Sequence, residues 1–196
     1  MAAAMGRIES LSHWVASDHF EELGAPPELF HGGFGLLSVG NLRKPRYWAL
    51  DRLARLGPQR LPVAVNGDGA GGLVEALAAR GDDGRISILV WNVTLDQRTI
   101  GADLDRQVTV RVAVPAGVSY MVRHYRIDAD HSNITRVWEE MSGGSGWPDD
   151  KQWALLGEAN TLDELVPATL VAGEDGLLEL GFDLPMPSVS CLELVP

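Results

Sequence analysis

The alternation of apolar and polar residues in the second half of the chain most constrains how it can fold. Between residues 108 and 114, valine occupies every second position, and Thr109 and Arg111 lie between the valines. A period of two is typical of a β-strand with one buried face. Five other segments are similar in length and lie between turns: residues 74–79, 86–92, 120–127, 177–184 and 189–195. Short strands at such spacing predict a mainly β protein, built as an antiparallel β-sandwich.

Three glycine-rich segments are predicted to be turns or loops. Gly81-Asp82-Asp83-Gly84 lies between two predicted strands and indicates a hairpin. Gly67-Asp68-Gly69-Ala70-Gly71-Gly72 is interpreted as a turn or linker. His31-Gly32-Gly33-Phe34-Gly35 lacks the lysine of a phosphate-binding loop and does not follow the strand that such a loop requires, so it is interpreted as a loop that closes over the end of a barrel.

A helical insertion interrupts the series of strands. Residues 133–141 and 149–160 have helical patterns, and Ser142-Gly143-Gly144-Ser145-Gly146 separates them as a flexible joint. Pro148 precedes two acidic residues, an arrangement that is typical of a helix start because acidic groups favour the positive end of the helix dipole.

The amino-terminal part of the chain has a different pattern. Residues 8–18 alternate as a strand would, and the two prolines of Gly24-Ala25-Pro26-Pro27 predict a loop. A helix is predicted from Pro45 to about residue 56, because apolar residues there recur at helical spacing and Gly57-Pro58 ends the pattern.

Composition and charge exclude several classes of function. The net charge of −11 and the isoelectric point near 4.8 argue against nucleic acid and anionic membranes as partners. No apolar run approaches the roughly 20 residues of a membrane-spanning helix. Residues 1–7 have neither the basic start nor the apolar core of a secretory signal, so we expect a cytoplasmic protein.

Cys191 is the single cysteine and is expected to be a buried structural thiol.

Two groups of sequence blocks resemble a known family. The first group is residues 12–22 (SHWVASDHFEE), 30–37 (FHGGFGLL) and 40–50 (GNLRKPRYWAL). The second is residues 124–128 (HYRID) and 131–133 (HSN) with Trp138, Trp147-Pro148 and Gln152. The first group resembles the end of the catalytic barrel of glycoside hydrolase family 39, whose bacterial members include β-xylosidases. The second is similar to the β-sandwich of that family and its helical excursion.

The resemblance implies a division of the chain into two parts. Residues 1–60 would be a remnant of the (β/α)8 catalytic barrel: its last strand at residues 8–18, a loop, and the helix at residues 45–56. Residues 61–196 would be a β-sandwich accessory domain with a helical insertion at about residues 133–160.

The resemblance also implies an activity for the intact protein. Family members of this kind are retaining β-xylosidases that hydrolyse O-glycosyl bonds of xylo-oligosaccharides with a glutamate nucleophile and a glutamate acid/base. In the family both glutamates lie on earlier barrel strands, so we expect no catalytic residue in this chain and no activity from it alone. A xylose-containing carbohydrate is the implied partner, with no cofactor and no metal. His13 and Ala16 differ from the bulkier residues usual in the family, which leaves the exact sugar open.

By the resemblance, Trp14, Phe20, Glu21 and Glu22 lie at the carboxyl end of the last barrel strand, where the sites of such barrels form. The tryptophan would offer an apolar platform to a sugar ring, and a glutamate would accept hydrogen bonds from its hydroxyls. Adjacent residues rarely flank one bond from opposite faces, so Glu21 and Glu22 are not expected to be the catalytic pair. A core position for Trp14 and a solvated loop for the glutamates are the alternatives.

Asp128, Asp130, His131 and Asn133 have side chains that could bind a metal ion. Their spacing alone is weak support for a metal site, and a hydrogen-bonded turn after a strand is favoured instead.

Two other functions remain open. The sandwich could be a non-catalytic carbohydrate-binding or assembly module, which exposed aromatics across one sheet face would favour. Trp91, Tyr120, Tyr125 and Trp138 are spread along the chain among apolar residues, which is more typical of a core. The chain could also be an inactive gene remnant. An unpaired strand edge at residues 8–16 would allow self-association into a homo-oligomer.

Overall fold

The computed structural model describes residues 9–10, 12–19, 24–99 and 103–196. Its contacts divide the chain into two compact units. The first unit comprises Met1–Asp51 and Ala129–Leu162, and the second comprises Arg52–Asp128 and Asp163–Pro196. Each unit is described below by itself. No helix in the described part of the chain is long and apolar enough to cross a membrane.

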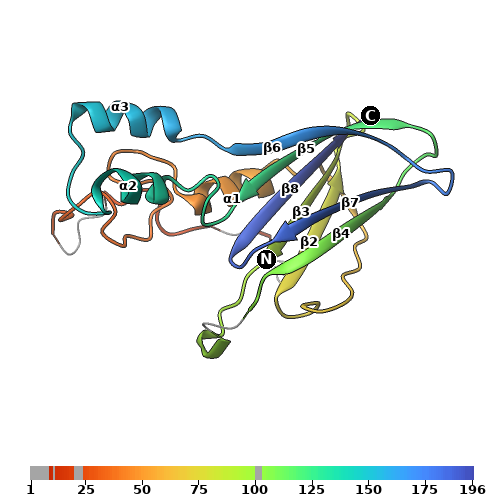
Figure 1. Cartoon of the computed structure of the whole chain (residues 1–196), viewed down its shortest axis with the longest axis horizontal. Coiled ribbons are helices and arrows are strands. Elements are labelled where there is room, and N and C mark those ends of the chain that lie inside the picture. The colour runs from red at the N-terminus through yellow and green to blue at the C-terminus, as the bar shows by residue number, and fades with distance from the viewer. Residues whose placement is uncertain (1–8, 11, 20–23, 100–102) are drawn as a thin grey trace. The chain divides into compact units, whose positions relative to one another are not determined.

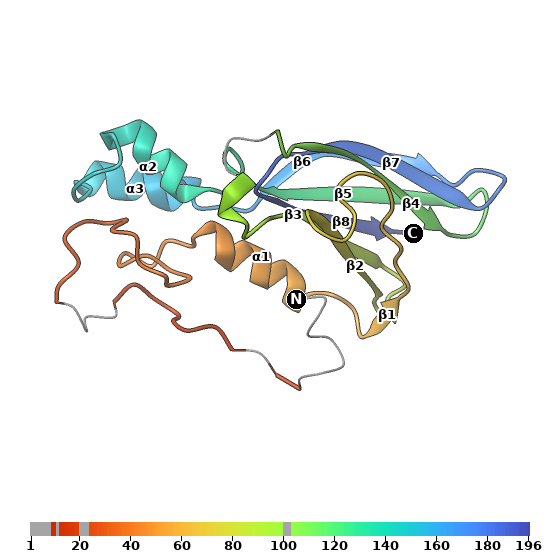
Figure 2. The same ribbon diagram turned by 90° about the horizontal axis from the view of Figure 1, so that it is seen from below.

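The second unit is the predicted antiparallel β-sandwich (Figure 1). The larger sheet has the strand order β1-β2-β3-β8-β5-β6, and the smaller sheet pairs β4 with β7. Together β4 and β7 form a layer over one face of the larger sheet (Figure 2). The strands are β1 (Gln59–Leu61), β2 (Val74–Arg80), β3 (Ile86–Asn92), β4 (Arg106–Ala113), β5 (Ser119–Ile127), β6 (Asp163–Val171), β7 (Leu177–Leu184) and β8 (Ser188–Val195). A short 3-10 helix, η2, spans Gln97–Thr99.

The core of this unit lies between the two sheets. Ile88, Val122 and Leu192 of the larger sheet are buried together with Leu178 of the smaller one. The alternation predicted in β4 is confirmed, because its valines face this core while Thr109 and Arg111 face outward. The transfer of these side chains out of water is what holds the two layers together.

The predicted hairpin at residues 81–84 is also confirmed. It joins β2 to β3, whose end residues Arg80 and Ile86 are paired. The Gly81 amide donates to the Arg85 carbonyl at 2.8 Å. Gly84 has a φ of +82°, a left-handed conformation that glycine adopts without steric cost.

Sequence patterns did not predict β1 or β6. The strand β6 lies at one edge of the larger sheet and contains Pro167, beside an irregularity in the pairing with β5. Proline is tolerated in such a place because an edge strand needs hydrogen bonds on one side only. Across this pair, Arg123 donates to Glu164 at 2.8 and 2.6 Å, which lowers the pKa of that carboxyl.

The predicted helical insertion is confirmed in the first unit, where α2 (Ile134–Ser142) and α3 (Asp150–Ala159) lie side by side. Asp149 and Gln152 form a capping box at the start of α3. Gly143, with a φ of +72°, ends α2 in the left-handed conformation.

The two helices share a small core with the amino-terminal segment. Leu29 and Leu42 pack with Ile134, Trp138 and Leu156, and all of these side chains are buried. Packing therefore groups the insertion with the first fifty residues. The expected boundary between residues 60 and 61 separates a barrel remnant from an accessory domain, as the family resemblance implies. The division into two packing units does not test that boundary, so it stays a prediction.

The predicted helix after the loop is confirmed as α1 (Pro45–Ala54). The predicted strand at residues 8–18 is wrong for the residues that the structure describes there; Ile8 and Leu11 lie outside them. Ser17 forms one isolated parallel bridge with Leu37. A barrel strand needs hydrogen-bonded neighbours on both edges, whereas the backbone–backbone hydrogen bonds of the described residues here go only to Leu36 and Leu37.

Because each unit has its own core, a cavity in one should leave the other folded. We expect Trp138→Ala to destabilise the first unit by about 3–5 kcal/mol, since this indole is 1% exposed. Hydrogen exchange should accelerate in α2 and α3 and change little in β3 and β8. Trp147→Ala is the matched control, because that side chain is 47% exposed. Equal acceleration in β3 and β8 would contradict separate cores.

Candidate functional site

The structure describes one of the four predicted site residues. Trp14 is 67% exposed, so it is not a core side chain. Phe20, Glu21 and Glu22 lie outside the described residues, and their roles stay predictions. Trp14 and the loops that follow it are therefore the described part of the candidate site.

Three short segments of backbone hold the loops together. The amides of Leu36 and Leu37 donate to the carbonyls of Val15 and Ala16, at 3.2 and 3.0 Å. On the other side, the Lys44 amide donates to the Leu36 carbonyl at 3.0 Å. Residues 15–18 are thus tied to the loop at residues 31–37 and, through it, to the start of α1.

A buried ion pair lies at the centre of these segments. The Lys44 ammonium donates to both carboxylate oxygens of Asp18, at 3.0 and 2.7 Å, and to the Gly33 carbonyl at 2.7 Å. The Gly35 amide donates to Asp18 Oδ1 at 2.8 Å. The Asp18 side chain is only 1% exposed, so these bonds replace the water that the charge has lost. With both oxygens occupied, Asp18 positions the loop and is not available to substrate.

The ion pair explains the glycines of residues 31–35. A Cβ at Gly33 or at Gly35 would lie 2.5 or 2.6 Å from Asp18 Oδ1, which is too close for any side chain. The backbone can approach the carboxylate only because these residues have no Cβ. The segment is a loop that folds around Asp18, as predicted, and its expected position over the end of the barrel stays a prediction.

The segments held by the Asp18–Lys44 ion pair carry two exposed aromatic side chains, Trp14 and Phe34. Phe34 is 51% exposed and lies between the two glycines that contact Asp18. The His13 Nε2 group donates to the Phe34 carbonyl at 3.1 Å, which links the residue before Trp14 to this loop. Exposed aromatic faces on a rigid backbone provide apolar platforms for a ligand that also carries polar groups. Sequence reasoning selected Trp14 and missed Phe34, although its glycine neighbours were a signal of exposure.

The residues considered from sequence as metal ligands or as exposed aromatics have structural roles instead. Asp128 forms an ion pair with Arg126 at 3.3 Å, and the Asn133 side chain donates to the Ala129 carbonyl at 3.0 Å within a turn. In the described part of the chain, no three His, Cys, Asp or Glu side chains are grouped as metal ligands would be. Tyr120 and Tyr125 are buried, as their interpretation as core residues predicted.

Comparisons with known proteins agree on one family. The model of the family "Glycosyl hydrolases family 39" matches residues 1–172. A β-xylosidase of Geobacillus stearothermophilus is 29% identical over 189 residues, which are 95% of this chain and 34% of that protein. A β-xylosidase of Caldicellulosiruptor saccharolyticus is 29% identical over 130 residues, 66% of this chain and 25% of that protein. The chain thus spans about a quarter to a third of the length of these curated relatives.

Solved structures have the same fold. The GH39 enzyme from Xanthomonas axonopodis pv. citri superposes with a TM-score of 0.79 and 25% identity, over 98% of this chain and 38% of that chain. A monomeric β-xylosidase from Caulobacter crescentus superposes with a TM-score of 0.75 and 21% identity, over 98% of this chain and 39% of that chain.

The buried ion pair makes a prediction about the loops around Trp14. We expect Lys44→Met to destabilise the first unit by about 3–5 kcal/mol, because it leaves the buried Asp18 carboxylate without its countercharge. Hydrogen exchange at residues 33–37 should accelerate, and urea denaturation measures the loss of stability. Lys151→Met, at an exposed position of α3, is the control and should change neither. An unchanged stability for Lys44→Met would show that the pair does not hold the loop.

Proposed function

The chain belongs to glycosyl hydrolase family 39, and on this premise we propose that it is the carboxyl-terminal, sugar-contacting portion of a retaining β-xylosidase. The match of the family model to residues 1–172 carries the proposal. The curated relatives that it matches are β-xylosidases, which supports xylose-containing oligosaccharides as the substrate class.

The chemistry of a retaining glycosidase needs two carboxyl groups about 5–5.5 Å apart, one as nucleophile and one as acid/base. Asp18, the buried carboxylate beside the candidate site, is held by Lys44 and the Gly35 amide. We therefore propose that polypeptide outside these 196 residues supplies both catalytic glutamates. Relatives about three times as long as the matched region have ample room for them.

In this proposal the chain contributes binding contacts. Trp14 would present its exposed ring to the apolar face of a sugar. Phe20, Glu21 and Glu22 follow it in the sequence, and their contacts with the same sugar are part of the proposal. The glutamates would accept hydrogen bonds from sugar hydroxyls, which are charge-assisted and strong. Asp18 and Lys44 are positioning residues, because they hold the backbone that carries Trp14 without contacting the sugar.

The first test is turnover. We expect the purified chain alone not to release the aryl group from an aryl β-xyloside, because binding contacts cannot replace an absent nucleophile and acid. Absorbance of the released phenol measures the rate. Turnover that survives stringent purification and disappears in Glu21→Gln would contradict the proposal.

The second test is binding. We expect xylobiose to bind weakly, with a Kd of about 1 mM or higher, since only part of a subsite is present. The indole N–H signal of Trp14 in a heteronuclear NMR spectrum should shift during the titration, and Trp14→Ala should abolish the shifts of its neighbours.

Trp147→Ala is the matched control for this titration, because its indole is also exposed but is held by the Pro27 carbonyl at 3.1 Å. It should leave the binding unchanged. Xylobiose shifts that persist in Trp14→Ala, or shifts centred on Trp147, would place the sugar elsewhere.

A further inference from the structure

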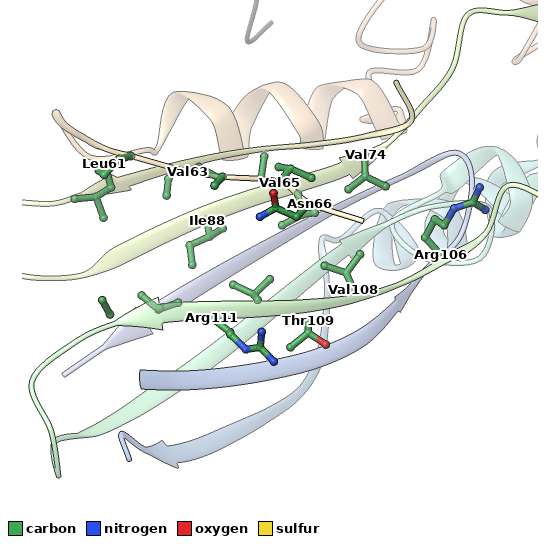
Figure 3. Close-up of a pocket in the computed structure, with 18 of the residues that line it drawn as sticks. Leu61, Val63, Val65, Asn66, Val74, Ile88, Arg106, Val108, Thr109 and Arg111 are labelled. Atoms are coloured by element: carbon green, nitrogen blue, oxygen red, sulfur yellow. The ribbon is translucent and has the colours of Figure 1, made fainter. Parts of the chain in front are cut away.

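The turn before β2 contains the one asparagine of the sequence that a glycine follows, Asn66-Gly67. Asn66 ends the segment from Leu61, which lines a groove of about 660 Å³ together with residues of β2, β3 and β4 (Figure 3). Asn66, Gly67 and Asp68 are all exposed. Solvent therefore reaches both the side chain of Asn66 and the backbone that follows it.

No hydrogen bond among the described residues holds the reactive atoms of this pair. Neither the Asn66 side chain nor the Gly67 amide has a partner there. Gly67 has a φ of +94°, and a Cβ placed on it would have no atom within 4 Å. The turn is anchored beyond the Gly67 amide, because the Gly67 carbonyl accepts the Ala70 amide at 3.2 Å and the Gly69 carbonyl accepts the Val74 amide at 2.9 Å.

The other four asparagines lack this combination, and none of them precedes a glycine. Asn92 is fully buried, and its side-chain amide donates to two backbone carbonyls at 2.8 and 3.0 Å. The side chains of Asn133 and Asn160 also form hydrogen bonds to backbone carbonyls. Asn41 is followed by Leu42, whose backbone amide donates to a serine hydroxyl at 3.2 Å.

We propose that Asn66 is a site of spontaneous deamidation, with water as the co-reactant. The Gly67 backbone nitrogen attacks Cγ of Asn66, and the new bond closes a five-membered succinimide ring. The bond between Cγ and Nδ2 breaks, and the side-chain nitrogen leaves as ammonia with the proton of the Gly67 amide. Water then opens the ring at either carbonyl and gives aspartate or isoaspartate. No atom is oxidised or reduced, and the step does not rest on the proposed function.

The structure of the turn favours the ring closure. The attacking nitrogen belongs to the next residue along the chain, so the reaction is intramolecular and depends on how freely the backbone reaches the required geometry. Glycine has no Cβ to oppose that geometry. Because the Gly67 amide is exposed and donates no hydrogen bond to a described residue, its proton is accessible to base.

Deamidation changes the charge of the groove wall. Asn66, Asp68 and Arg106 all line the groove, and Asp68 forms an ion pair with Arg106 at 3.0 Å. The product has a second carboxylate two residues before Asp68 and adds one negative charge to the net charge of −11. The core residues of the sandwich lie elsewhere, so we expect the modified chain to stay folded.

The experiment incubates the purified chain near neutral pH, digests it in acid and maps the peptides by mass spectrometry. We expect the peptide that contains Asn66 to gain about 1 Da, at a rate at least about tenfold above that of any other asparagine. The rate should increase with pH, because the attacking nitrogen must lose its proton. In water labelled with heavy oxygen the gain should be about 3 Da, because water supplies the new oxygen atom.

Two glycine variants in the same turn isolate the ring closure. Gly67→Ala should slow the reaction at Asn66 by about tenfold or more, because the added Cβ opposes the attack. Gly71→Ala is the matched control. Gly71 also has a positive φ, +75°, and also has no atom within 4 Å of an added Cβ, but it does not follow an asparagine. It should leave the rate unchanged.

The chain unfolded in urea gives the reference rates. We expect Asn66 to react in the folded chain within about threefold of its rate in urea, whereas the buried Asn92 should react at least about tenfold more slowly when folded. The comparison of Gly67→Ala with Gly71→Ala is repeated in urea, so it does not depend on whether either variant folds.

Three outcomes would overturn the inference. The peptide of Asn66 could gain mass no faster than those of the other asparagines. Gly67→Ala could react at the same rate as Gly71→Ala, in the folded chain and in urea. Asn66 could react in the folded chain more than about tenfold more slowly than in urea, which would show that the fold protects it.

Discussion

The structure of the second unit depends on covering the apolar inner face of the larger sheet. This face is wider than the smaller sheet that packs against it. In the described part of the chain the larger sheet has six strands and the smaller has two, so β4 and β7 do not span its full width. Where they do cover it, Ile88, Val122 and Leu192 are buried and the unit has a well-packed core. Beside Ala76, which is half-buried, a groove along β4 remains. The hydrophobic burial that stabilises the sandwich is therefore less complete along this side of β4.

The first unit uses a different combination of forces to position the segment that carries Trp14. Its helices and amino-terminal loops share a small core around Trp138, and the loops are held by one buried ion pair between Asp18 and Lys44. A buried charge is stable only when its hydrogen bonds are complete, and here a backbone amide and an ammonium group complete them. These contacts hold the backbone near Trp14, while its side chain is exposed.

Sequence patterns predicted the elements whose signals are local. The alternation in β4, the hairpin at Gly81–Gly84 and the glycine-rich joint between α2 and α3 each depend on neighbouring residues, and each was predicted. The edge strand β6 was missed because its proline contradicts a strand pattern unless the strand is known to lie at an edge. The segment at residues 8–18 was predicted to be a strand because its alternation is real, but a parallel strand also needs neighbours on both edges. In the site, Trp14 was selected from a resemblance, whereas the Asp18–Lys44 pair joins residues 26 apart that no spacing rule connects.

By itself the sequence determined the class of fold and the family, since both follow from residue types at short spacing along the chain. Alternating valines require a facing sheet, and the blocks around Trp14 and His124 are sequence properties. Tertiary structure alone decided which carboxylate is buried, why Gly33 and Gly35 must lack side chains, and where β4 keeps a free edge. These features depend on which segments meet in space, and close approach, desolvation and strand order are properties of packed layers rather than of any one segment.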